Sequence, residues 1–216
     1  MILERRTELR TKLLLAALRH VTFDGWTDVA FHRAISDLGW SIEEYDRLFP
    51  SGPPEAGILL FQLADLSMSS ALTQKQSADF RTRDRVSLAL RIWLTFLNPY
   101  KDAVRRLVPF MSLSGNNLLG LECLYHTVDT IWYSAGDKST DFNFYTKRAL
   151  LASVLSSSIL FWLNDNSFES EDTWGFIDRR IENIMSLQKL RTKVDGLCSR
   201  LPDLSSLLRV IRPINR

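Results

Sequence analysis

Apolar residues recur at helical spacing along nearly the whole chain. Over residues 3–20, for example, Leu9, Leu13, Ala16 and Ala17 fall on one face of a helix. Strand-type alternation bounded by turn residues never persists. The pattern therefore predicts an all-α fold.

Capping residues, glycines and prolines divide this pattern into separate helices. The expected ranges are 3–20, 27–38, a short helix starting at 41–44, then 55–72, 78–97, one begun by Asn98-Pro99, 116–134, 142–163, 173–197 and 203–212. Ser41 and Glu44 have the spacing of a capping box at the start of the short helix. Pro50, Pro53 and Pro54 are expected to close that first unit.

Three regions follow from these boundaries. Residues 1–50 have the layout of a helix-turn-helix unit, 51–199 form a larger helical bundle, and 200–216 form a basic amphipathic helix. This layout resembles the TetR family of regulators, whose third helix reads DNA. Here residues 24–50 contain six acidic residues and only two basic ones. Because DNA phosphates must be neutralised by Lys and Arg, we expect no nucleic-acid binding.

Composition limits the other classes of protein. The chain has 216 residues, 45% of them apolar and 24% charged, which is enough for one sizeable core or two modest ones. Its longest uncharged stretch, residues 149–164, contains four serines and falls short of the roughly 18 apolar residues of a membrane span. The acidic residues near the amino terminus are untypical of a transit peptide. We expect a folded first helix, no membrane span and no disulfide framework.

Catalytic motifs are missing from the sequence. It contains no GxSxG, HExxH, CxxC, GxGxxG or Walker sequence. Glu122, His126 and Asp129 share a helix face and invite a metal or acid-base interpretation, but no second helix offers a matching set of ligands. We expect a buried polar pair or a hydrated stripe there, with no catalytic residue, metal or cofactor.

The helices at 116–134 and 142–163 are more apolar than one buried face requires. They could form ordinary core, or they could enclose a cavity for an apolar ligand, to which Tyr125 and the serines at 153 and 156–158 would offer polar contacts. The candidate lipid-binding residues are Leu121, Leu124, Tyr125, Val128, Leu151, Val154, Leu155 and Ser158.

Two stretches carry a specific resemblance. The first runs from Asp129 to Leu150, DTIWYSAGDKSTDFNFYTKRAL, and the second from Asp172 to Ile181, DTWGFIDRRI. Both are similar to the hallmark sequences of the Coq-nine family of ubiquinone-biosynthesis proteins. The similarity is dense over residues 129–185 and looser towards the amino terminus.

This resemblance implies a TetR-like homodimer that binds isoprenoid lipid and presents quinone precursors to demethoxyubiquinone hydroxylase. The family's hydroxylase-facing patch would fall on Ile131, Asp141, Phe144 and Tyr145. Many members have tryptophan where this chain has Phe144, which keeps an aromatic anchor without the indole N–H. Phe144 and Tyr145 are adjacent on one helical turn, so they cannot both face the core. An anchor at the surface and an aromatic tucked under the neighbouring loop both remain possible.

The last helix is amphipathic and basic. Leu204, Leu207, Leu208 and Ile211 share one face, while Arg209 and Arg212 lie on the other. The segment could lie on a membrane surface, or it could pack on the body or across a dimer. We expect a peripheral membrane protein, on the cytoplasmic side of a bacterial inner membrane or the matrix side of a mitochondrial one. A transcriptional regulator with an apolar pocket is the alternative.

Overall fold

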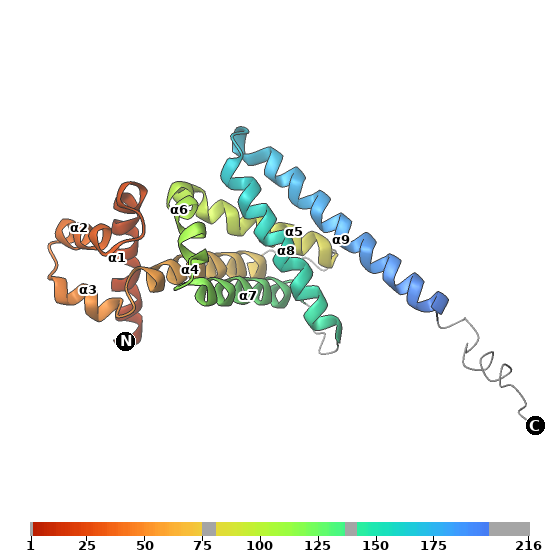
Figure 1. Cartoon of the computed structure of the whole chain (residues 1–216), viewed down its shortest axis with the longest axis horizontal. Helices are drawn as coiled ribbons and strands as arrows, with labels where there is room; N and C mark the ends of the chain where they lie inside the picture. The colour runs from red at the N-terminus through yellow and green to blue at the C-terminus, as the bar shows by residue number, and fades with distance from the viewer. Residues whose placement is uncertain (1, 75–80, 137–141, 199–216) are drawn as a thin grey trace, which may run out of the picture.

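The computed structural model describes residues 2–74, 81–136 and 142–198, and within these ranges it is helical, without strands (Figure 1). Nine α-helices are described together with two short 3₁₀ turns, at Asn98–Tyr100 and Phe168–Ser170. The α-helices are α1 (Ile2–Asp24), α2 (Asp28–Leu38), α3 (Ile42–Leu48), α4 (Pro53–Gln74), α5 (Thr82–Leu97), α6 (Lys101–Ser112), α7 (Asn117–Ser134), α8 (Phe142–Asn164) and α9 (Glu171–Cys198). The all-α prediction is confirmed.

Helices α1 to α3 form the amino-terminal unit at one end of the molecule (Figure 1). Its core is aromatic: the Phe31 ring lies 5.4 Å from that of Tyr45 and 5.9 Å from that of Phe49. Gly39 ends α2 with a φ of 65°, a left-handed conformation that glycine adopts without steric cost. The indole N–H of Trp26 donates to the carbonyl of Ala103 in α6 at 3.0 Å, which ties this unit to the bundle.

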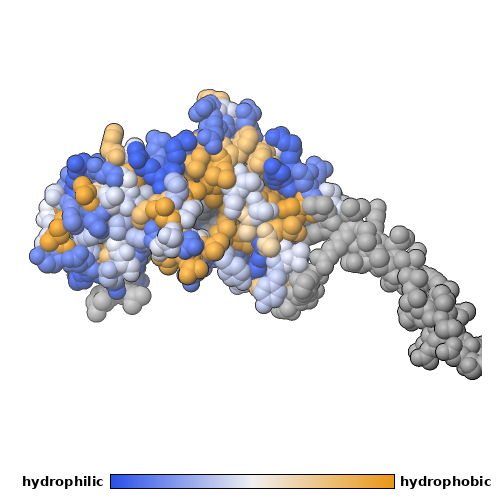
Figure 2. All heavy atoms as spheres, viewed as in Figure 1, coloured by the Kyte–Doolittle hydropathy of each residue, from blue (hydrophilic) through white to orange (hydrophobic). Residues whose placement is uncertain are grey.

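The bundle is arranged around α4. This helix packs along α5 and α7, while α8 packs against both α7 and α9 (Figure 1). In the described part of the chain, α4 is the one helix that is long and apolar enough to cross a membrane by length and composition. Asp65 interrupts this helix, so it is not the longest uncharged stretch of the sequence. Leu60, Ala64 and Met68 of α4 are fully buried in the core, whereas Leu66 is exposed. Apolar residues also appear on the visible surface of the bundle (Figure 2).

Several local predictions are wrong. Pro53 and Pro54 begin α4 instead of ending the preceding unit, as suits proline in the first turn of a helix. Ser41 makes no side-chain cap hydrogen bond, and Glu44 pairs with Arg47 instead, so the capping box does not form. Asn98 is the C-cap residue of α5 and starts a 3₁₀ turn, so the predicted cap of the next helix is wrong: the N-cap residue of α6 is Tyr100.

Candidate functional site

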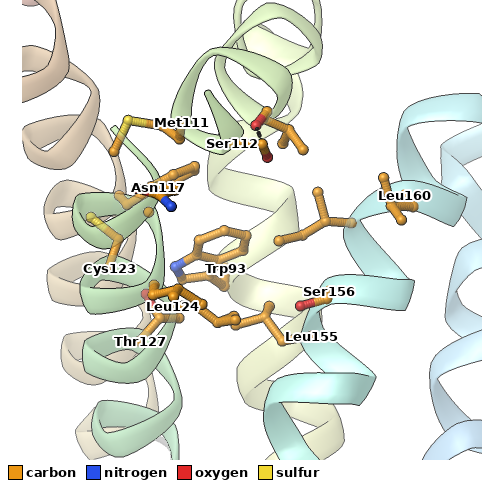
Figure 3. Close-up of a pocket in the computed structure, with 15 residues that line it drawn as sticks. Trp93, Met111, Ser112, Asn117, Cys123, Leu124, Thr127, Leu155, Ser156 and Leu160 are labelled. Atoms are coloured by element: carbon orange, nitrogen blue, oxygen red, sulfur yellow. Dashed lines mark hydrogen bonds between the residues drawn. The ribbon is translucent and has the colours of Figure 1, made fainter. Parts of the chain in front are cut away.

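A cavity of about 430 Å³ lies between the middle helices of the bundle (Figure 3). Its volume falls in the range of small-molecule sites, roughly 300–1,000 Å³. Five helices contribute to the wall, and most of the side chains are apolar or aromatic. The lining consists of Phe61, Trp93, Val108, Met111, Ser112, Asn117, Gly120, Leu121, Cys123, Leu124, Thr127, Leu155, Ser156, Ile159 and Leu160.

One wall is shaped by a glycine. A Cβ on Gly120 would lie 2.8 Å from the carbonyl oxygen of Met111, so only glycine lets α7 approach α6 this closely. Elsewhere in the lining, the Phe61 and Trp93 rings stack at 5.5 Å. The apolar cavity therefore lies between rigid elements that are already packed.

The structure brings together three of the eight candidate lipid-binding residues, namely Leu121, Leu124 and Leu155. Val128 is buried in the core, and Tyr125 is 51% exposed outside the lining. Leu151 and Val154 line a second, smaller cavity described below. Sequence reasoning missed the contributions of Phe61, Trp93 and α6, because only the fold shows that these elements meet α7.

The predicted serine contacts lie mostly elsewhere. Ser156 lines the cavity, whereas Ser153 and Ser157 donate to backbone carbonyls within α8. Ser158 is fully buried and its hydroxyl has no protein partner. The polar contribution of these serines to the cavity is therefore small.

A buried carboxylate behind the cavity wall holds three helices together. Asp65 of α4 is 4% exposed and accepts hydrogen bonds from Trp93 Nε1 at 2.8 Å and Thr127 Oγ1 at 3.2 Å. The His126 ring lies 3.0 Å from the same carboxylate. Burial raises the pKa of Asp65, while these hydrogen bonds oppose the shift. Trp93 and Thr127 direct their polar atoms to Asp65 and away from the cavity. The parts of these two side chains that face the cavity are therefore apolar.

His126, whose side chain is 61% exposed, pairs with Asp65 of α4, whereas the sequence grouped it with Glu122 and Asp129 of its own helix. Its predicted neighbour Asp129 pairs with Arg148 of α8 instead. Across the described residues there is no group of three potential metal ligands. Cys123 is a free thiol, and burial raises its pKa to about 11, with the charges of Asp65 and Glu122 adding to the shift. A thiol that stays protonated is a poor nucleophile.

The first hallmark stretch joins the end of α7 to the start of α8. The Arg148 guanidinium, 8% exposed, lies 3.3 Å from the Phe144 ring centroid and also binds Asp129. Phe144 is half-buried, and Tyr145 lies edge-on to it at 5.2 Å with 70% of its surface exposed.

The candidate partner-binding residues are thus not all at the surface. Ile131 is fully buried in the core. Asp141 lies outside the described residues, as do Leu204, Leu207, Leu208, Arg209, Ile211 and Arg212 of the carboxyl-terminal segment.

The second hallmark stretch fixes α9. Burial would raise the pKa of Asp165, but hydrogen bonds from Ser167 and Thr173 hold it at about 2. Further along α9, Asp178 accepts from Ser87 and pairs with Arg91 at 2.6 Å. Thr173 and Asp178 of this stretch therefore connect α9 to the segment before it and to α5.

Comparison with known proteins supports the resemblance. The COQ9 family model matches residues 118–188, which include both hallmark stretches. The ubiquinone biosynthesis protein COQ9 of Rattus norvegicus is 31% identical over 195 residues, covering 85% of this chain and 61% of the relative. The human COQ9 protein is 30% identical with similar coverage, and a probable coq9 protein of Dictyostelium discoideum is 27% identical over 197 residues. The chain thus spans about three fifths of the length of these relatives, all of which are named mitochondrial.

The fold has a solved counterpart as well. A TetR transcriptional regulator from Nitrosomonas europaea superimposes with a TM-score of 0.66 over 81% of this chain and 97% of its own, at 20% identity. At that identity the similarity concerns the fold alone. Sequence and fold together identify this chain as a relative of the COQ9 family built on a TetR-like fold.

Proposed function

We propose that this chain is a non-enzymatic accessory protein of ubiquinone biosynthesis that binds an isoprenoid lipid and presents it to another enzyme. The observation that carries the proposal is the cavity of about 430 Å³ whose wall is almost wholly apolar. We infer the pathway from the relatives, which are named ubiquinone biosynthesis proteins.

The chemistry of the cavity favours a prenyl tail. Each methylene-sized group removed from water contributes about 0.8 kcal/mol, and two five-carbon units therefore contribute about 8 kcal/mol. The polar atoms of Trp93 and Thr127 are already bonded to Asp65, so they compete little for a polar ring. We place the tail inside and the ring of the precursor towards the mouth, where Leu121 and Leu160 are exposed.

The side chains around the cavity favour binding over catalysis. Cys123 is held protonated, and Asp65 is enclosed by three donors and shielded from the cavity. Among the described residues we find no catalytic constellation at the cavity, so we assign chemistry on the bound lipid to a partner.

That partner would be a demethoxyubiquinone hydroxylase docked on the patch formed by Phe144 and Tyr145. Tyr145 has the exposure of an interface anchor, and Arg148 holds the adjacent ring from behind. We propose further that the protein acts as a homodimer and sits on a membrane through its basic carboxyl-terminal segment. That membrane would be the mitochondrial inner membrane on its matrix side, or the cytoplasmic side of a bacterial inner membrane.

A titration of the purified full chain with a ubiquinone that carries a two-unit prenyl tail tests the binding step. Leu124→Trp places a larger side chain into the cavity and should weaken binding at least tenfold, which corresponds to about 1.4 kcal/mol. The matched control is Leu66→Trp, the same substitution at a position that is 63% exposed on α4. Equal affinity of the two variants, or absence of saturable binding to the unaltered chain, would contradict the proposal.

A TetR-type regulator with an apolar ligand pocket is the second candidate, and the shared fold favours it. Against it, α3 is a seven-residue helix that exposes Glu43 and Asp46 where a DNA reader needs cations. Binding of operator-length duplex at low salt, weakened by added salt, would support the regulator. We expect no binding.

A further inference from the structure

A second cavity, of about 210 Å³, lies between α5, α7, α8 and α9, away from the apolar cavity of the proposed lipid site. Its inner wall is apolar, built from Val86, Trp132, Leu151, Val154, Ile181 and Ile184. Val86, Leu151 and Val154 are almost completely buried, so the floor of this cavity belongs to the core.

The remaining lining residues are Thr82 and two cations, Arg83 and Lys147. The Lys147 ammonium lies 5.6 Å above the Trp132 ring, and the Trp132 indole N–H donates to the Lys147 carbonyl at 3.2 Å. These contacts fix Lys147 and the ring beside each other at the edge of the cavity. Arg83 reaches the edge from α5 and contacts Asp84 at 3.2 Å, with its side chain about half exposed.

The edge of this cavity is cationic. Among the described residues that line it, two are cationic and none is acidic. Arg83 also lines the neighbouring groove between α5 and α9, whose acidic residues are Asp84, Asp178 and Glu182. An apolar floor below two cations is complementary to a molecule with a hydrocarbon chain and an anionic head.

We infer that this cavity is a binding site for a single-chain anionic amphiphile, with the chain between α8 and α9 and its carboxylate or phosphate between Arg83 and Lys147. The volume offers room for about seven groups of the size of a water molecule. This size suits a chain of intermediate length and is small for a long prenyl tail. The site is thus distinct in chemistry from the larger cavity, whose lining is uncharged.

Octyl phosphate and octanoate are suitable probes, because both carry an anionic head on a short chain. Titration of the purified full chain should show one saturable site for each, with octylamine at least tenfold weaker. The double variant Arg83→Gln/Lys147→Gln should weaken octyl phosphate roughly 30-fold, since each cation near an anionic lipid contributes about a factor of five to ten. The charge-matched control is Arg106→Gln/Arg179→Gln, at exposed positions outside the cavity, and it should leave the affinity unchanged.

Three further measurements keep the inference falsifiable. Ile184→Trp should fill the cavity and abolish octanoate binding, with the helical circular dichroism spectrum retained.

Inorganic phosphate alone should bind far more weakly than octyl phosphate; equal affinity would mean that the apolar floor contributes nothing and would overturn the site. Leu124→Trp should leave octanoate binding intact, so the two cavities can fail or succeed independently. Equal affinities for octylamine and octyl phosphate would also overturn the proposed site. So would an equal loss of octyl phosphate affinity in the two double variants.

Discussion

Replacing Asp65 by alanine should destabilise the fold and loosen the wall of the apolar cavity. The carboxylate is 4% exposed and receives donors from α5 and α7. Without it, the indole N–H of Trp93 and the hydroxyl of Thr127 remain buried, since these residues are only 1% and 2% exposed. His126 has an exposed side chain and can turn to water, so its loss costs little.

The magnitude follows from these two orphaned donors. Each buried donor left without a partner costs about 1–3 kcal/mol, so Asp65→Ala should lower the free energy of unfolding by about 2–6 kcal/mol. That is a large part of the usual 5–15 kcal/mol of a domain. Asp65→Asn keeps an acceptor oxygen in the same place and removes the buried charge, so it should cost less than about 2 kcal/mol.

Urea denaturation followed by circular dichroism measures both values. It also tests the sign of the pKa shift, which is upward from an ordinary value of 3.8 because burial disfavours the charge. As the pH rises above 3.8, the Asp65 carboxyl ionises in the unfolded chain before it ionises in the folded one. Between these two pKa values, the free energy of unfolding of the unaltered protein should therefore fall relative to that of Asp65→Asn. An alanine variant as stable as the asparagine variant would refute the reasoning.

The other predictions concern the surfaces and the cavity wall. Tyr145→Ala should weaken binding to demethoxyubiquinone hydroxylase at least tenfold in a titration, as loss of an aromatic anchor does, whereas Phe23→Ala on α1, a position at least as exposed, should not; unchanged affinity for Tyr145→Ala would remove the patch from the proposal. Deletion of residues 202–216 should abolish co-sedimentation with anionic vesicles, and undiminished sedimentation would exclude the tail from membrane binding. Gly120→Ala forces a Cβ towards the Met111 carbonyl oxygen, and thermal denaturation should show a loss of about 1–3 kcal/mol; a neutral result would contradict the close approach of α6 and α7.

Much of the fold could be predicted from sequence because helical periodicity is a local property. The ends of α7 and α8 were placed within a residue or two, and the helix-turn-helix layout follows from Gly25 and Gly39. Local capping was less predictable. Ser41 and Glu44 have the spacing of a capping box, but the Glu44 carboxylate forms an ion pair with Arg47 instead.

The site was only partly predictable, because a cavity is defined by helices that are distant in sequence. Leu124 and Leu155 could be named from the apolar excess of α7 and α8, yet Trp93 and Met111 become visible only when α5 and α6 are placed beside them. The same limit applies to Asp65. A lone acidic residue in an apolar helix signals a buried polar contact, but nothing in the sequence indicates that its partners lie on α5 and α7.

The central claim is that the bundle encloses a hydrocarbon ligand. Native mass spectrometry of the full chain purified from cells that make ubiquinone, combined with analysis of an organic extract, measures this directly. An isoprenoid species should be retained by the unaltered chain and by Leu66→Trp, and should be lost from Leu124→Trp. Unaltered protein without extractable hydrocarbon, or the same ligand content in all three proteins, would contradict it.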